Sequence, residues 1–361
     1  MLFRSDLAER RSSGQGLTNP ELSLLLAHTK ISAGQDVVAS SLPDDPYLRR
    51  VLSGYFPAPL RERFADLMES HRLRREIITT IAVNEMTDYS GTTFLFRLSE
   101  ETGASVPDLT RAWLVARDVF DMPAFWSSVE ALDGSIDIGT QITLLLEGRK
   151  LTERAARWLV HNRRPAFDIA STVGFFADGV RTVRSGLPKL LTGRDLAGFE
   201  ERRDSYAGRG VPADLAERVA AMVPTYSAFD IVQIAVSVPG RSVEETADVY
   251  FDLADRLQIG RLRDRITALA REDRWSTMAR AALRDDLYAA HASLTSDVLG
   301  VSGTGAPEER LAAWVSRNEA AVAMATQTLA EIWESERFTF TTLSVALRAI
   351  RTLVASSSLP H

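Results

Sequence analysis

Apolar residues recur at steps of three and four along most of the chain, the spacing that places them on one face of an α-helix. One such run lies between residues 242 and 258, and a longer one lies between 307 and 335. The pattern predicts amphipathic helices whose apolar faces are Val243, Ala247, Tyr250, Phe251, Ala254 and Leu257 in the first run, and Leu311, Trp314, Val315, Val322, Ala325, Leu329 and Ile332 in the second.

The starts of three runs carry a typical helix-capping signal. In each, a hydroxyl residue stands three positions before a carboxylate residue, as in Thr18–Glu21, Ser105–Asp108 and Ser242–Glu245. The hydroxyl can accept from the backbone N–H of the third residue, and the carboxylate favours the positive end of the helix dipole. These pairs predict helix starts at residues 19, 106 and 243.

The fold class predicted from this pattern is all-α, with helix-on-helix packing around one or two cores and little or no sheet. The segments Thr92–Phe96 and Phe338–Thr341 alternate only in part and adjoin helical patterns, so we expect them to be helical or irregular. Between proline and glycine breakers, the predicted helices are 19–39, 45–55, 58–85, 106–120, 123–132, 137–162, 168–191, 195–207, 213–222, 226–237, 242–258, 260–270, 275–299, 307–335 and 341–355.

The same breakers suggest a division of the chain into two helical subdomains. We expect a seam at Asn162–Pro165, which separates a subdomain over 17–162 from a second one over 163–355. Residues 1–16 and 356–361 are predicted to be tails, and residues 300–305 a loop. No fixed-period repeat is visible, so the pattern does not favour a solenoid.

Composition places the chain among ordinary globular proteins. Hydrophobic residues make up 45% and charged residues 25% of the 361 positions, and the net charge is −6. No stretch without a charged residue exceeds 11 residues, as in Ala320–Ala330, whereas a membrane span needs roughly 20. No secretory signal and no cysteine are present. We therefore expect a cytoplasmic, soluble protein without a membrane partner.

Arginine dominates the basic residues: of 42 Lys and Arg, only Lys30, Lys150 and Lys189 are lysines. Arginine suits forked ion pairs and phosphate recognition alike. The strongest basic cluster is His71–Arg75, but Glu69 and Glu76 flank it and acidic residues outnumber basic ones overall. The cluster predicts a solvated or ion-paired helix face rather than a nucleic-acid site, with docking of a protein partner as an open alternative.

No complete catalytic motif is found in the sequence. Gly303-Thr304-Gly305 lacks the third glycine and the preceding strand of a dinucleotide-binding turn, so a flexible loop is expected there. The tryptophans are expected in cores or interfaces, and the histidines on helix surfaces or boundaries rather than as metal ligands. These residues are Trp113, Trp126, Trp158, Trp275, Trp314 and Trp333, and His28, His71, His161, His291 and His361.

Two aspartate pairs, Asp44-Asp45 and Asp285-Asp286, are similar to the start of the motif with which helical isoprenoid synthases hold magnesium and a diphosphate. That motif needs a further aspartate three residues on, where this chain has Leu48 and Ala289. Asp45 stands directly before Pro46, a pattern typical of a helix cap, and the second pair lies within a predicted helix beside Arg284. Capping and surface charge are the favoured interpretations. A helical diphosphate-processing enzyme is the weaker alternative.

An ordered series of motifs resembles the C-terminal helical region of the large NAD-dependent glutamate dehydrogenases of bacteria. The series runs from about residue 14 to 355 and departs from the family pattern at Thr87, Asp88 and Tyr89. Its main segments are Gly16–Leu22, Leu42–Leu48, Tyr55–Pro57 with Leu60–Phe64, His71–Ile78, Gly91–Phe94, Glu100–Ala104, Ile136–Gln141, Arg157–Leu159, Tyr226–Val232, and Asp273–Trp275 with Ala279–Tyr288.

The resemblance implies that the holoenzyme deaminates L-glutamate to 2-oxoglutarate with NAD. Its catalytic lysines, aspartate and nucleotide fingerprint lie upstream of this region, and none maps onto this sequence. We therefore expect no catalytic, cofactor-binding or metal site here, and no NAD binding or glutamate oxidation by the isolated chain. The implied role is assembly and regulation, with the catalytic domain of the same polypeptide and sister subunits of a homo-oligomer as partners. A free-standing helical interaction module remains the alternative.

Overall fold

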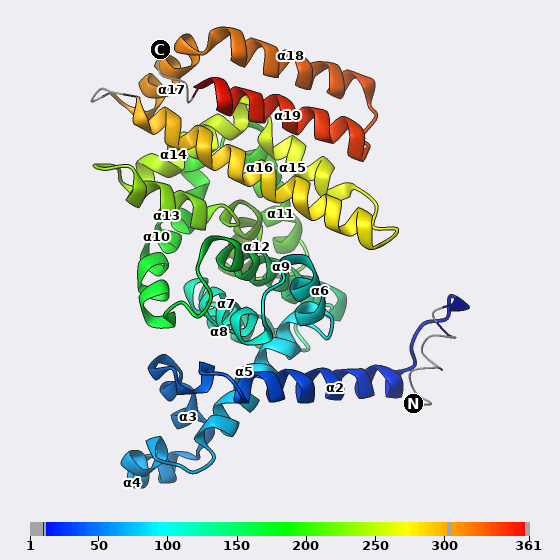
Figure 1. Cartoon of the computed structure of the whole chain (residues 1–361), viewed down its shortest axis with the longest axis vertical. Helices are drawn as coiled ribbons and strands as arrows, with labels where there is room; N and C mark the ends of the chain where they lie inside the picture. Colours follow the sequence, from blue (N-terminus) through cyan, green and yellow to red (C-terminus); the bar gives the residue numbers. More distant parts are fainter. Residues whose placement is uncertain (1–9, 11, 302–304, 358–361) are drawn as a thin grey trace. The chain divides into compact units, whose positions relative to one another are not determined.

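In a computed structural model of the chain, residues 10, 12–301 and 305–357 are described (Figure 1). They form 18 α-helices and two short 3₁₀-helices, and no strand occurs among these residues. The prediction of an all-α fold is therefore confirmed. Gly303 and Thr304 of the predicted loop, most of the N-terminal tail and His361 lie outside the described residues.

The chain divides into two compact units, each made of two stretches of sequence. Unit 1 comprises residues 1–123 and 152–174, and unit 2 comprises 124–151 and 175–361. The loop after residue 162, where the sequence predicts a seam, lies within unit 1. Three helices contribute residues to both units: α8 (Met122–Glu130), α9 (Ile138–Asn162) and α10 (Ile169–Leu190).

Unit 1 is organised around two helices, α5 and α7. Helix α5 packs against α2, α3 and α7, and α7 also packs against α2 and α6. Every residue of α7 from Leu109 to Arg117 is buried. The elements that belong wholly to unit 1 are α2 (Asn19–Val38), η1 (Leu42–Asp44), η2 (Pro46–Leu48), α3 (Arg49–Tyr55), α4 (Ala58–Glu69), α5 (Arg74–Ser90), α6 (Phe94–Thr102) and α7 (Val106–Val119).

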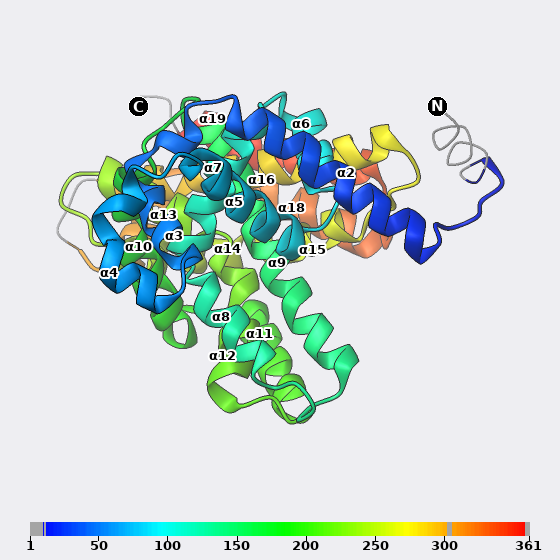
Figure 2. The same ribbon diagram turned by 90° about the horizontal axis from the view of Figure 1, so that it is seen from below.

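Unit 2 is organised around the long helix α16, which packs against α13, α14, α15, α17 and α19. Helices α11 and α12 lie side by side in this unit (Figure 2). The elements that belong wholly to unit 2 are α11 (Gly193–Ala207), α12 (Ala213–Thr225), α13 (Ala228–Ser237), α14 (Val243–Arg256), α15 (Ile259–Ala268), α16 (Arg274–Gly300), α17 (Pro307–Arg317), α18 (Glu319–Ser335) and α19 (Phe340–Ser357).

The predicted helix starts are confirmed with their caps. The backbone N–H of Asp108 donates to Ser105 Oγ at 3.3 Å, and that of Glu245 donates to Ser242 Oγ at 3.1 Å. At Thr18 the reciprocal half of the capping box is present, since its backbone N–H donates to Glu21 Oε2 at 2.8 Å. The ambiguous segments 92–96 and 338–341 enter α6 and α19, so they are helical or irregular as predicted.

Two segments that the sequence predicts as single long helices each form two separate helices in the structure. The run predicted over 58–85 breaks at Ser70–Leu73, where the backbone turns and His71 N donates to the Met68 carbonyl at 3.1 Å. The run predicted over 307–335 breaks at Asn318, whose side-chain amide donates to the Trp314 carbonyl at 2.9 Å. A side-chain amide that competes for the helix carbonyls favours such a break. Apolar periodicity continues across both breaks and therefore does not reveal them.

No single helix among the described residues is long and apolar enough to cross a membrane. Helices α12 and α13 meet these requirements only when taken together, as a pair bent by 59°.

Candidate functional site

A set of buried charges in unit 1 lies where α7 meets Asp45 and the short helix η2. Arg111 of α7 pairs with Asp45 through Nη1 and Oδ2 at 2.8 Å, and the two side chains are only 7% and 8% exposed. Arg111 also donates to the Phe167 carbonyl at 2.9 Å. Asp45 accepts in addition from the Tyr47 backbone N–H at 3.0 Å, and so caps η2. A buried ion pair needs this kind of full satisfaction, since its desolvation is costly.

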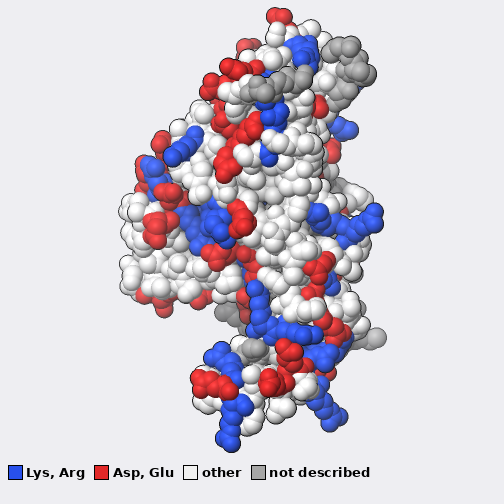
Figure 3. Space-filling view, turned by 90° about the vertical axis from the view of Figure 1, so that its left-hand side faces the viewer, with Lys and Arg blue, Asp and Glu red and all other residues white. Residues whose placement is uncertain are grey.

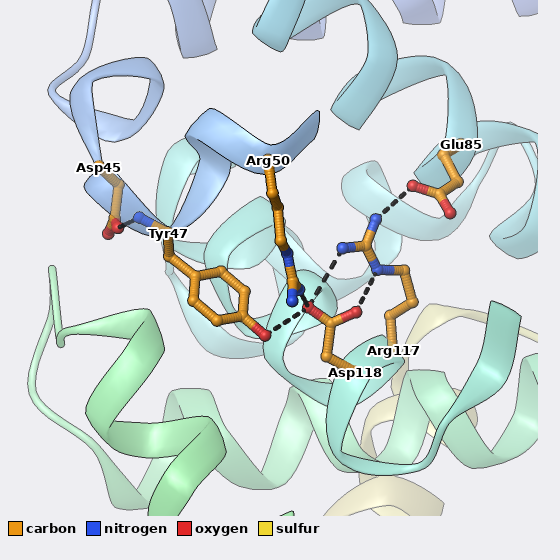
Figure 4. A network of polar contacts seen from close by, with 6 residues as sticks. All are labelled: Asp45, Tyr47, Arg50, Glu85, Arg117 and Asp118. Carbon is orange, nitrogen blue, oxygen red and sulfur yellow. Dashed lines mark hydrogen bonds and ion pairs between the residues drawn. The ribbon is translucent and has the colours of Figure 1, made fainter. Parts of the chain in front are cut away.

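Asp118, at the end of α7, joins three further side chains in a network (Figure 4). Tyr47 donates its hydroxyl to Asp118 Oδ2 at 2.9 Å, and Arg117 Nε donates to Oδ1 at 2.8 Å. Arg50 of α3 also pairs with Asp118, and its guanidinium lies 3.9 Å from the centre of the Tyr47 ring. Arg117 pairs in addition with Glu85 of α5. The network therefore connects η2, α3, α5 and α7.

Two pKa shifts follow from this arrangement. Burial and the negative charge of Asp118 raise the pKa of Tyr47 to about 12. Burial acts to lower the pKa of Arg117, but its hydrogen bonds and ion pairs with Asp118 and Glu85 outweigh burial and raise the pKa above its usual value. Both residues therefore keep their protons at neutral pH and act as donors to carboxylates.

Two arginines of the basic cluster His71–Arg75 are ion-paired, in line with the prediction of a solvated or ion-paired helix face. Arg74 Nη2 pairs with Asp44 Oδ1 at 3.0 Å, and Arg75 pairs with the other oxygen of Asp44. Arg75 also donates to the carbonyls of Val38 and Ser40, both at 2.8 Å. These contacts fasten the N-terminal end of α5 to the loop after α2. On the face drawn in Figure 3, basic and acidic side chains lie next to one another rather than gathering by sign.

The structure confirms the interpretation of both aspartate pairs as capping or surface charges. Asp44 and Asp45 are engaged by arginines and by the η2 cap, as described above. Asp286 lies within α16 and pairs with Arg351 at 3.2 Å, both side chains being exposed. Among the described residues there is no group of three or more His, Asp or Glu side chains that could hold a metal ion.

Unit 2 contains a second polar cluster. The side chain of Arg263 is 14% exposed and donates from Nη2 to Asp195 at 3.1 Å and to Asp264 at 3.3 Å. Burial opposes its charge, but Tyr288 and the two aspartates outweigh burial and raise the pKa of Arg263. The pairs link α11 to α15, in the same manner as Arg111 and Arg117 link the helices of unit 1.

One histidine differs from the prediction. His291 is fully buried within unit 2, not at a surface or boundary. Its Nε2 lies 2.9 Å from the Tyr250 carbonyl oxygen, and burial lowers the pKa of His291 to about 3. The reason is its place on α16, on the same face as the buried Leu287 and Leu294.

Five of the six tryptophans are buried or half-buried, and one is exposed. Trp113, Trp126, Trp314 and Trp333 are buried, and Trp158 is half-buried. Trp275, in the first turn of α16, is 71% exposed, with the Arg274 guanidinium 5.8 Å from the centre of its ring. Trp275 therefore lies outside the core, because the α16 stripe of buried residues begins only at Ala281, and its predicted place in an interface stays a prediction.

The family model described as "Glutamate dehydrogenase, C-terminal" matches residues 14–352, which include both units. The chain belongs to this glutamate dehydrogenase family. It is 37% identical over 353 residues to the NAD-specific glutamate dehydrogenase of Mycobacterium tuberculosis, 33% over 354 residues to that of Halomonas elongata, and 35% over 353 residues to that of Pseudomonas aeruginosa. Each match covers 98% of this chain and 22% of the relative.

The chain thus spans about one fifth of the length of these glutamate dehydrogenases and corresponds to their C-terminal part. Two of the segments that carry the resemblance, Leu42–Leu48 and His71–Ile78, supply residues to the Asp44 and Asp118 contacts. At the position where the sequence departs from the family pattern, Asp88 pairs with Lys30 of α2 at 2.7 Å.

Arg111, Arg117 and Asp118 are candidate functional residues that the sequence did not reveal as a network. A signal was present, since these three charged residues interrupt the mostly apolar run from Leu109 to Val119. A charge on a face that must be buried requires an opposite charge nearby. The partners lie 66 residues away in the case of Asp45 and 32 in the case of Glu85, so the sequence alone does not identify them.

Proposed function

We propose that this chain is the C-terminal, non-catalytic region of a large NAD-dependent glutamate dehydrogenase and serves its assembly and regulation. The observation that carries the proposal is the match of residues 14–352 to the C-terminal family, within relatives of which this chain covers 22%. In the proposal the full-length enzyme oxidatively deaminates L-glutamate to 2-oxoglutarate. NAD binds upstream of this region, and the partners are the catalytic domain and sister subunits in the cytoplasm.

The contacts within each unit support an architectural role. Arginines of α7 and α15 pair with other elements, through Asp45 and Glu85 in unit 1 and through Asp195 in unit 2. Such pairs fix the relative position of the helices they join, because breaking one leaves a buried charge without its partner. A region held in this way offers a defined surface to the rest of the enzyme.

Truncation of the full-length enzyme before Leu17 tests the proposal. A surface that binds only the folded catalytic part stabilises that part by linkage. We expect the truncated enzyme to melt at a lower temperature or to dissociate, while the specific activity of what remains assembled falls less steeply. Light scattering and glutamate turnover are measured on the same preparation, with full-length Arg181→Ala as a control for an exposed change. An intact oligomer without turnover would show that the region contributes to the active site and would overturn the proposal.

A further inference from the structure

The first half of α2 carries large aliphatic side chains that the rest of the described chain does not cover. Between residues 12 and 32 every side chain is exposed or half-buried, and the first buried residue of the helix is Ala33. Leu22, Leu24 and Ile31 are 47%, 41% and 58% exposed, and Leu25 and Leu26 are half-buried. Figure 1 shows this half of α2 extending away from α3 and α5 of the same unit.

The exposed residues do not form one stripe. At 3.6 residues per turn, Leu24 lies about 200° around the helix axis from Leu22. Leu26 falls close to Leu22, whereas Ile31 falls close to Leu24, so apolar side chains occupy opposite faces. Residues 22–29 contain no Lys, Arg, Asp or Glu. A helix that is apolar all round is typical of a buried helix, not of a helix on a protein surface.

A groove continues this surface between α2 and α5. It has a volume of about 360 Å³. Ile31, Gly34, Val38, Thr79, Thr80 and Val83 line it, together with the polar or charged Lys30, Gln35, Glu76 and Asn84. Leu24, Ile31 and Val38 follow one another at intervals of seven residues, so the Leu24 face of α2 leads directly into the groove. The volume lies within the range of pockets that accept small ligands.

We propose that the first half of α2 and the α2/α5 groove dock against the part of the glutamate dehydrogenase polypeptide that precedes this region, an inference that rests on the proposed function. Because the family is C-terminal and this chain covers 22% of its relatives, most of the polypeptide in those proteins precedes α2. The covalent connection gives that part a high effective concentration at this helix. The uncharged faces of residues 22–29 fit an apolar groove of this neighbour rather than a charged partner.

Hydrogen exchange of α2 in the full-length enzyme and in the 361-residue chain tests this docking. We expect the amides of residues 19–32 to exchange at least tenfold more slowly in the full-length enzyme, because docking suppresses local opening of the helix. The double variant Leu22→Gln/Leu24→Gln should abolish that protection and leave the melting temperature of the 361-residue chain unchanged. The matched control is Val236→Gln/Met324→Gln, which removes two apolar side chains that are 60% and 65% exposed in unit 2. This control should retain full protection of α2.

Three outcomes would overturn the inference. Equal exchange in the two proteins would show that nothing upstream covers α2. Protection that survives Leu22→Gln/Leu24→Gln would place the contact elsewhere. Protection that the 361-residue chain acquires on its own as its concentration rises would show that a second copy covers the helix. The truncation before Leu17 tests the proposed function independently, so it distinguishes a wrong docking site from a wrong proposed function. If truncation dissociates the enzyme but exchange at 19–32 is unchanged, only the assignment of α2 is wrong.

Discussion

Arg111 and Asp45 form an ion pair of 2.8 Å in which both side chains are more than nine-tenths buried, although 66 residues separate them in sequence. Arg111 donates with the same nitrogen to the Phe167 carbonyl, and Asp45 also caps η2. The pair therefore joins three segments of unit 1 at one point, and its loss affects all of them.

Removal of one partner should be far more costly than neutralisation of both. We expect Arg111→Met to reduce the free energy of unfolding of the chain by about 3–5 kcal/mol, because Asp45 is left buried and unpaired. The double variant Arg111→Met/Asp45→Asn should recover most of that loss, since asparagine retains the cap. Urea denaturation measures both. The control is Arg181→Ala, which removes an exposed pair with Asp178 and should change stability by less than about 0.5 kcal/mol. A double variant as unstable as the single one would contradict this account.

His291 should make the chain sensitive to mild acid. Its pKa is lowered by burial to about 3, whereas an unfolded histidine titrates near 6.5. Between these values the unfolded state binds the extra proton, so stability is complete above pH 6.5 and declines as the pH falls toward 3. As the pH falls from 6.5 to 5, the neutral buried His291 should lower the free energy of unfolding by about 2 kcal/mol. We expect His291→Gln to reduce this part of the pH dependence of urea unfolding, and His28→Gln, at an exposed position, to leave it unchanged.

Tyr47→Phe should show how much the Tyr47 hydroxyl contributes to the free energy of unfolding. Tyr47→Phe keeps the ring beneath Arg50 but removes the 2.9 Å hydrogen bond to Asp118, and we expect a loss of about 1–2 kcal/mol in unfolding free energy. The raised pKa also makes a prediction at high pH. The pKa of Tyr47 is about 12 in the folded state and 10 in the unfolded state. The stabilisation of the folded state by the protonated Tyr47 is therefore present below pH 10 and is lost as the pH rises toward 12. Absorbance of the tyrosinate ion in wild type and Tyr47→Phe measures that titration.

Two glycines inside helices should respond in opposite ways to alanine. At Gly34 an added Cβ meets only Thr79 Cγ2 at 3.9 Å, so Gly34→Ala should raise stability by about 0.5–1 kcal/mol through helix propensity. At Gly179 in α10 an added Cβ lies 2.5 Å from Val232 Cγ2 of α13, so Gly179→Ala should cost about 1–3 kcal/mol. The melting temperatures of the two variants, each compared with wild type, test these opposite predictions. Equal shifts would show that the space around the two glycines does not govern the effect.

Local chemistry explains why much of the helical framework is predictable from sequence. Caps such as Ser105 and Ser242 act within three residues of their partners, and the apolar stripe of α14 follows a fixed period. The polar network is different, because Arg117 stands four residues from Trp113 on a helix that is buried all round, and its partner Glu85 comes from another helix. Trp275 and His291 show the same limit, since residue type alone does not decide which face of α16 is covered.

The division of the chain has a consequence for its synthesis on the ribosome. Unit 1 needs residues 152–174, yet residues 124–151 belong to unit 2 and emerge first. At about 5–20 residues per second, the first 123 residues wait about 3–10 s for the segment that completes their core. During the same interval the stretch 124–151 has no partner, because the remainder of its unit begins only at residue 175. Each unit is therefore exposed to misfolding and to chaperones at a defined point of translation. Slow codons placed after position 174 would give the completed unit 1 time to fold, but they would lengthen the wait of residues 124–151 for the rest of unit 2.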